Sequence, residues 1–89
     1  MQWNVDFSPQ SVTFLAKNHI PEKEVLEKIH LVLRKFNGED VSVDVRKAKG
    51  KWAGFHRIRS GKLRIIVAFY FKPKEVFIDT IDWRGNVYK

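Results

Sequence analysis

Two spacings of apolar residues divide the chain into a helical first half and a strand-rich second half. Apolar and polar residues alternate over residues 3–7, and this period of two predicts a short strand. Ser8 and Pro9 follow as the N-cap and the first residue of a helix, which we expect over residues 9–18. The spacing predicts that this helix buries Val12, Leu15 and Ala16.

A second helix is predicted between Pro21 and the pair Asn37-Gly38. Pro21 separates the two helices because a proline disfavours helical dihedrals in the residue before it. Glycine at position 38 tolerates the left-handed conformation that ends many helices. One stripe of this helix is apolar: Val25, Leu26, Ile29, Leu33 and Phe36. The two helices should therefore form a hairpin that packs by one face onto a flat partner.

The second half of the chain predicts that this partner is a sheet. Valines alternate with polar residues over residues 41–46, and three further strand-like runs follow at residues 55–59, 63–71 and 76–81. We predict a single domain over residues 1–89 of the α+β class. In it, the N-terminal short strand and the two-helix hairpin pack on one face of a mainly antiparallel sheet of about four to five strands.

The hairpin predicted around Ser60-Gly61 separates charge from apolar side chains. If these two residues form the turn, Arg59 pairs with Lys62 and Ile58 with Leu63. Alternation then places four cations on one face, namely Arg57, Arg59, Lys62 and Arg64. The other face carries Ile58, Leu63, Ile65 and Val67, and His56 lies with them. Because like charges on facing strands destabilise a sheet, the pattern favours an anion bound to the cationic face. The alternative is a solvated surface with Asp79 or Asp82 as counter-charge.

Composition favours a polyanionic partner. The chain has 17 Lys and Arg against 10 Asp and Glu, a net charge of +7. Part of this charge lies on the loop before the cationic hairpin, at Lys47, Lys49 and Lys51. Trp83 and Tyr88 offer ring planes on which an unstacked base could lie, as readers of single-stranded RNA require. Packing in the core is an equally good interpretation of Trp83.

The absence of cysteine excludes disulfides, thiolate metal sites and cysteine nucleophiles. No pair of histidines has the spacing of metal ligands, and the carboxylates form no acid and base dyad, so we expect neither a metal nor a cofactor. The first residues do not have the composition of a secretory leader, and no apolar run is long enough to cross a bilayer. A cytoplasmic protein without membrane contact is the expectation.

Four segments, in order, resemble the RelE/ParE superfamily of toxins from toxin–antitoxin pairs: WNVDFSP, KAKG, HRIRSGKLR and IDWRGNVY. The resemblance extends over nearly the whole chain and implies a RelE-like, microbial-RNase-like fold. RelE-like members are metal-independent endoribonucleases that cut mRNA on the ribosome, whereas ParE-like members inhibit DNA gyrase. The WRGNVY ending is more similar to the RelE branch. A gyrase inhibitor and a non-toxic RNA-binding relic of the fold remain the alternatives.

The resemblance also implies a site. Its catalytic residues fall on Arg57, Arg59, Arg64, Arg84 and Tyr88. The placement of charge and of the aromatic ring, and not the resemblance, predicts RNA-binding roles for Lys47, Lys49, Lys51, Lys62 and Trp83. Some RelE members carry lysines in the hairpin where this chain has Arg57 and Arg59. Arginine stays protonated in proteins, so these two residues would act by stabilising charge and not by accepting a proton. The implied partners are mRNA on the ribosome and a cognate acidic antitoxin similar to RelB.

Overall fold

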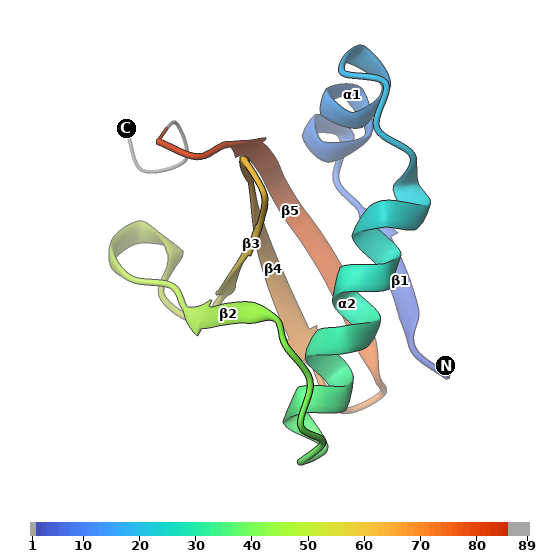
Figure 1. Ribbon diagram of the computed structural model, residues 1–89, viewed down its shortest axis with the longest axis vertical. Coiled ribbons are helices and arrows are strands. Elements are labelled where there is room, and N and C mark those ends of the chain that lie inside the picture. Colours follow the sequence, from blue (N-terminus) through green and yellow to red (C-terminus); the bar gives the residue numbers. More distant parts are fainter. Residues whose placement is uncertain (1, 86–89) are drawn as a thin grey trace.

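The computed structural model describes residues 2–85. It consists of one mixed sheet that two helices cover on a single face (Figure 1). The elements within these residues are β1 (Asn4–Phe7), α1 (Pro9–Lys17), α2 (Glu22–Phe36), β2 (Asp44–Lys47), the short 3-10 helix η1 (Gly50–Trp52), β3 (His56–Ser60), β4 (Leu63–Tyr70) and β5 (Glu75–Trp83). No helix among them is long and apolar enough to cross a membrane. The predicted α+β class with helices on one face is confirmed.

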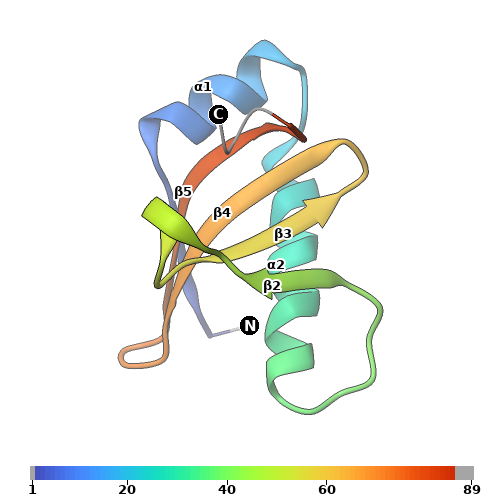
Figure 2. The same ribbon diagram turned by 90° about the vertical axis from the view of Figure 1, so that its left-hand side faces the viewer.

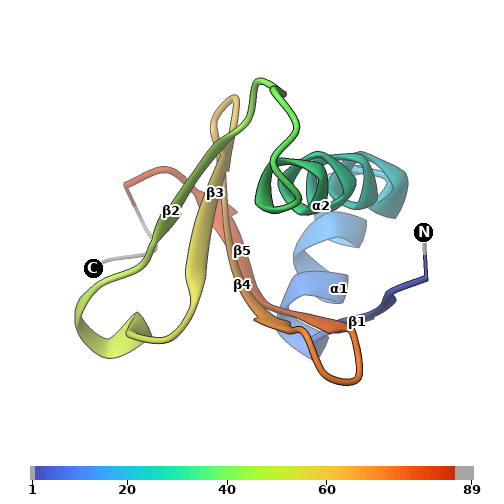
Figure 3. The ribbon, with the colours of Figure 1, turned by 90° about the horizontal axis from the view of Figure 1, so that it is seen from below.

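The strand order of the sheet is β1-β5-β4-β3-β2. Strands β2 to β5 form an antiparallel meander, as expected, and β1 adds to β5 as a parallel edge strand. Seen from below, the sheet stands between the two helices and the segment that carries η1 (Figure 3). We refer to the two sides as the helix-covered face and the open face.

The first helix begins where the sequence predicts but turns a different side toward the sheet. The Ser8 hydroxyl accepts a hydrogen bond from the Ser11 N–H, which confirms Ser8 as the N-cap. Ser11 and Leu15 are buried, whereas Val12 is 45% exposed and Ala16 is exposed. The prediction for Val12 and Ala16 was wrong. The Ser11 hydroxyl donates to the Ser8 carbonyl and lies 3.4 Å from the Ile78 carbonyl, so this polar contact sets the rotation of the helix.

The second helix supplies most of the cover of the sheet. Val25 and Ile29 are buried as predicted, and Val32, which the predicted stripe left out, is buried with them. Phe36 lies at the edge of the stripe and is partly exposed. Gly38 has a φ of 91°, the left-handed conformation expected after the helix. The core then forms between these residues and the helix-covered side chains Ile58, Ile65, Val67, Val76, Ile78 and Ile81.

The turn between β3 and β4 differs from the expected one by a single residue. Ser60 pairs with Leu63 and Arg59 with Arg64, so Gly61 and Lys62 form the turn. The predicted pairing of Arg59 with Lys62 was wrong. Gly61 has a φ of 59° at the first central position, where a type II′ turn requires a positive φ. Lys62 therefore lies in the turn and not on a strand face.

Candidate nucleic-acid interface

Three arginines share the open face of the β3–β4 hairpin. Ile58 pairs with Ile65, and both are buried under the helices. Because side chains alternate along a strand, Arg57, Arg59 and Arg64 project from the opposite side. Figure 2 looks onto this side, where β2, β3 and β4 pass in front of α2. The predicted placement of these three arginines opposite Ile58 and Ile65 is confirmed, but the separation is not complete, because the buried Ile66 pairs with Arg57 on the open face.

These arginines are not ordinary surface cations. Arg57 is 6% exposed and Arg64 is 9% exposed. From the neighbouring strand, one carboxylate approaches two of them: Asp44 Oδ1 lies 3.7 Å from Arg57 Nη2, and Asp44 Oδ2 lies 4.0 Å from Arg59 Nη1. Asp44 stands opposite Arg59 in the ladder. The Arg59 side chain is more open, at 38% exposed. Partly neutralised guanidinium groups on one sheet face, two of them on largely buried side chains, form a site with strong anion-binding capacity.

Of the two aspartates of β5 that the sequence suggested as counter-charge, Asp82 stands directly opposite Arg64 in the ladder. The carboxylate of Asp82 accepts a hydrogen bond of 2.7 Å from the Trp83 N–H, and that of Asp79 accepts one of 2.8 Å from the Thr80 hydroxyl. Asp44 therefore adds, next to Arg57 and Arg59, a counter-charge that the sequence analysis did not name. Asp44 can approach these arginines because β2 lies beside β3. The sequence of one strand does not show which strand will lie beside it.

Arg46 is a further open-face cation that was not among the predicted site residues. It pairs with Arg57 across β2 and β3 and is exposed. The signal was present in the sequence, because Arg46 alternates with Val45 in the same way as Asp44. Strands β2, β3 and β4 therefore all contribute arginine to one face.

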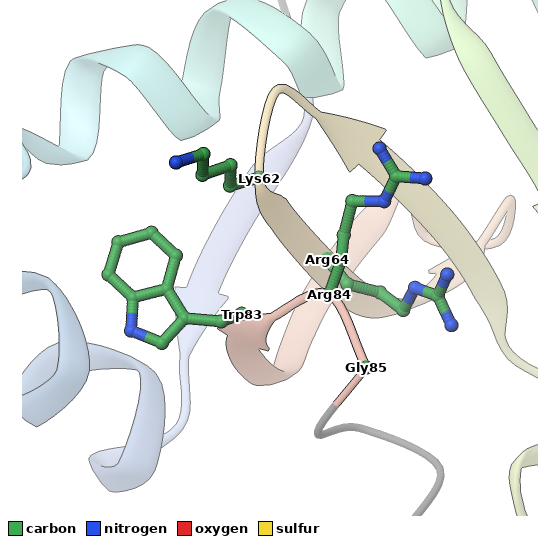
Figure 4. A pocket seen from close by; sticks show the side chains of 5 residues that line it. All are labelled: Lys62, Arg64, Trp83, Arg84 and Gly85. Carbon is green, nitrogen blue, oxygen red and sulfur yellow. The ribbon is translucent and has the colours of Figure 1, made fainter.

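A shallow hollow of about 470 Å³ lies at the end of the same hairpin, lined by Lys62, Arg64, Trp83, Arg84 and Gly85. The Arg84 N–H donates to the Lys62 carbonyl at 2.7 Å, and this bond continues the pairing of β5 with the turn. The Arg84 guanidinium lies 3.5 Å from the Gly61 carbonyl. Arg64 and Arg84 extend to one side and Lys62 and Trp83 to the other (Figure 4). Arg84 is thus brought to Arg64, whereas Tyr88 lies outside the described residues.

Trp83 combines the two interpretations that the sequence allowed. Its ring meets Phe14 of α1 edge-on at a centroid distance of 5.3 Å. It nevertheless remains 39% exposed and lines the hollow beside Lys62. A ring that is fixed on one edge and open on the other can pack against the helix and still present surface to a base.

The loop lysines are more dispersed than the arginines. Lys47 pairs with His56, so its ladder position belongs to the helix-covered face. Lys49 precedes η1, and the Lys51 ammonium lies 5.5 Å from the Trp52 ring centroid. In Figure 3 the segment carrying η1 curves away from the helices. Lys49 and Lys51 therefore belong to the open side of the molecule, and Lys47 is separated from the arginines by the strand itself.

His56 lies on the helix-covered face, as predicted. Its ring meets those of Phe36 and Phe69 at centroid distances of 5.3 and 5.5 Å. Burial, with a smaller contribution from the Lys47 ammonium, lowers the pKa of His56 below its ordinary value of 6.5. The imidazole is therefore neutral at pH 7 and stands on the other side of the sheet from the three arginines.

Residues 2–85 contain no group of three histidine, aspartate or glutamate side chains that could hold a metal ion. A phosphate ester is the ligand class that matches the guanidinium groups of the candidate site, because its oxygens accept paired hydrogen bonds from arginine.

No protein-family model and no curated protein matches the chain. Solved structures do match. One is YafQ of the E. coli DinJ-YafQ toxin-antitoxin complex, with 14% identity, a TM-score of 0.66 and full coverage of both chains. Another is YoeB of the heterotetrameric YoeB-YefM toxin-antitoxin complex from Staphylococcus aureus, with 17% identity, a TM-score of 0.63 and coverage of 94% of this chain and 99% of that one. A third is the RelBE2 toxin-antitoxin complex from Mycobacterium tuberculosis, with 19% identity, a TM-score of 0.60 and coverage of 94% and 100%. At such identities these matches establish a common fold.

Proposed function

We propose that this chain, which has the fold of the RelE-like toxins, is the toxin of a type II toxin–antitoxin system and cuts mRNA on the ribosome. One observation carries the proposal most directly: Arg57, Arg59 and Arg64 gather on the open face of one hairpin. Arg84 adds a further cation at the end of that hairpin. The resemblance of HRIRSGKLR and WRGNVY to the RelE branch supports the same activity.

The proposed reaction is transfer of a phosphodiester within the RNA chain. The 2′-hydroxyl attacks the adjacent phosphorus in line and releases its proton to water, the bond from phosphorus to the 5′-oxygen breaks, and the departing 5′-oxygen takes a proton from water. A 2′,3′-cyclic phosphate and a 5′-hydroxyl result. Arg57, Arg59 and Arg64 bind the phosphate oxygens and stabilise the negative charge that builds on them. Arg84 stabilises the departing 5′-oxygen. Since arginines remain protonated, these residues act through charge and position, and the ribosome contributes to the alignment of the RNA.

The RNA-binding role is assigned to residues around this centre. Lys62 and Trp83 line the hollow beside Arg64, where they would contact the nucleotide next to the cut. Lys49 and Lys51 would approach the RNA backbone from the loop, and the resemblance assigns stacking on a nucleotide to Tyr88. Lys47 keeps its place in this proposed set, with a ladder position opposite His56 on the helix-covered face.

The proposed partner is an acidic antitoxin. Several of the similar structures are complexes named for a toxin and an antitoxin. A chain with a net charge of +7 and buried arginines on an open face would be neutralised by an acidic segment lying over that face. We place the toxin in the cytoplasm, where translated mRNA is found.

Primer extension on mRNA from cells expressing the chain tests the proposal. New cuts within translated codons are expected, together with growth arrest, and Arg64→Ala and Arg84→Ala should remove both. Absence of cuts, or cuts that both variants preserve, would refute the nuclease. Inhibition of purified gyrase without mRNA cleavage would favour the ParE-like alternative. Salt-sensitive RNA binding without growth arrest would favour the relic.

A further inference from the structure

Asp44 is the residue of the arginine cluster to which neither the motifs nor the resemblance assign a role. It approaches Arg57 and Arg59 at once, with N to O distances of 3.7 and 4.0 Å. Both distances are longer than a hydrogen bond, so the carboxylate attracts two guanidinium groups without occupying an N–H donor of either at this contact. Arg59 Nε is buried and has no hydrogen-bond partner within residues 2–85.

The ladder explains why a negative charge is needed at this point. Arg59 stands directly opposite Arg64, and Arg46 stands opposite Arg57. Like charges on facing strands repel, and the guanidinium groups would move apart toward solvent unless something attracts them. Asp44 faces Arg59 from the third strand and is 43% exposed, so it can hold the two side chains while the open face stays accessible to RNA.

We propose that Asp44 is a positioning residue of the nuclease, which holds Arg57 and Arg59 in place by charge while leaving donors of Arg59 for a phosphate. This inference rests on the proposed function. A carboxylate beside a phosphate site also repels the bound RNA. Asp44 should therefore weaken ground-state binding of RNA slightly and still raise the rate of cleavage, because fixed guanidinium groups meet the transition state without rearranging.

The test compares Asp44→Asn, which keeps the shape and removes the charge, with Asp44→Glu and with the control Asp40→Asn. Asp40 is an exposed residue ahead of β2, so its variant removes the same charge from the same segment. In Asp44→Asn, cleavage on saturating ribosomes should fall roughly 10- to 100-fold, the effect of a misplaced catalytic group. Affinity for an RNA with a 2′-deoxy cut site should stay equal or become up to about fivefold tighter. Asp44→Glu should recover part of the rate, and Asp40→Asn should match the wild type.

A readout without catalysis separates this inference from the proposed function. The side-chain Nε–H signals of Arg57 and Arg59 in NMR spectra should be sharp in the wild type and in Asp40→Asn, and should broaden in Asp44→Asn while the backbone spectrum is kept. If the wild type does not cut mRNA, the proposed function fails, and these signals still decide the role of Asp44. Unchanged signals, cleavage by Asp44→Asn within about twofold of the wild type, or joint loss of affinity and rate would overturn the inference. So would loss of a carboxylate step from the pH–rate profile in Asp44→Asn, since that would identify Asp44 as a proton acceptor.

Discussion

At neighbouring positions of β3, the two faces of the β3–β4 hairpin bury side chains of opposite chemistry. On the helix-covered face Ile58 is fully buried, and one residue away on the open face Arg57 is only 6% exposed. Burial of Ile58 removes apolar surface from water and stabilises the fold. Burial of Arg57 removes hydration from a charge, which destabilises the fold unless an anion compensates.

A low exposure therefore does not identify a core residue in this protein. The apolar face could be exchanged for another of equal volume and the domain would still fold. The arginine face has no such substitute, because its charges stand opposite one another and need a negative partner. Four changes, described below in order of expected effect, test whether the two faces divide stability from activity.

The largest effect is expected on the helix-covered face. Ile58→Ala removes a fully buried side chain that pairs with Ile65, and it should lower the free energy of unfolding by about 2 to 5 kcal/mol. Urea denaturation measures this. Val12→Ala is the matched control because Val12 is 45% exposed, and it should change stability by less than about 0.5 kcal/mol. Equal effects of the two changes would mean that this face is not the core.

On the open face the same kind of truncation should affect activity instead. Arg64→Ala should lower cleavage roughly 10²- to 10³-fold, the range seen when a donor to a developing negative charge is removed. Its free energy of unfolding should change by less than about 1 kcal/mol, because the loss of stem packing is offset by the loss of repulsion from Arg59. Single-turnover cleavage and urea denaturation on the same preparations check both. A stability loss as large as that of Ile58→Ala would make Arg64 a structural residue.

The arrangement of faces could be predicted from the sequence even though the register could not. Moving the turn from Ser60-Gly61 to Gly61-Lys62 shifts each strand partner by two residues, and a shift of two keeps every side chain on its face. Arg57, Arg59 and Arg64 were therefore assigned to one face correctly from a wrong pairing. Lys62 alone changed its position, because it entered the turn.

Contacts between distant segments were beyond the sequence. Asp44 stands opposite Arg59 only because of the register between β2 and β3, which the sequence analysis did not predict, whereas Asp82 of the expected neighbour β5 stands opposite Arg64. The burial of Ser11 in place of Val12 has the same origin, since the Ile78 carbonyl that Ser11 approaches belongs to the last strand. Local periodicity predicts the buried side of a helix with an error of about one position. Contacts with the strand that packs against the helix determine which residue at that position is buried.

A third change tests whether RNA contacts only the open face at β2. Arg46→Ala removes a cation that pairs with Arg57 on the open face, and Lys47→Ala removes the next one, whose ladder position belongs to the other face. Arg46→Ala should reduce the slope of RNA affinity against salt concentration by about 0.7, the contribution of one phosphate contact on a single strand. Lys47→Ala should reduce it less. Titrations of a labelled RNA at several salt concentrations measure both slopes, and equal reductions would show that RNA reaches around the edge of the sheet.

The smallest effect is expected at His56, where the helix-covered face carries a titratable group. Burial and the Lys47 ammonium lower the pKa of His56 below 6.5, so the unfolded chain binds this proton more readily than the folded one. Stability should consequently rise with pH from the lowered pKa up to about 6.5 and gain nothing from this group above it. His56→Phe keeps the ring contacts with Phe36 and Phe69 and removes the titration. Denaturation at about pH 5 and about pH 8 should give a smaller stability difference for His56→Phe than for the wild type, because the variant lacks the contribution of His56 alone. An equal or larger difference in the variant would mean that this imidazole is as well hydrated in the folded protein as in the unfolded chain.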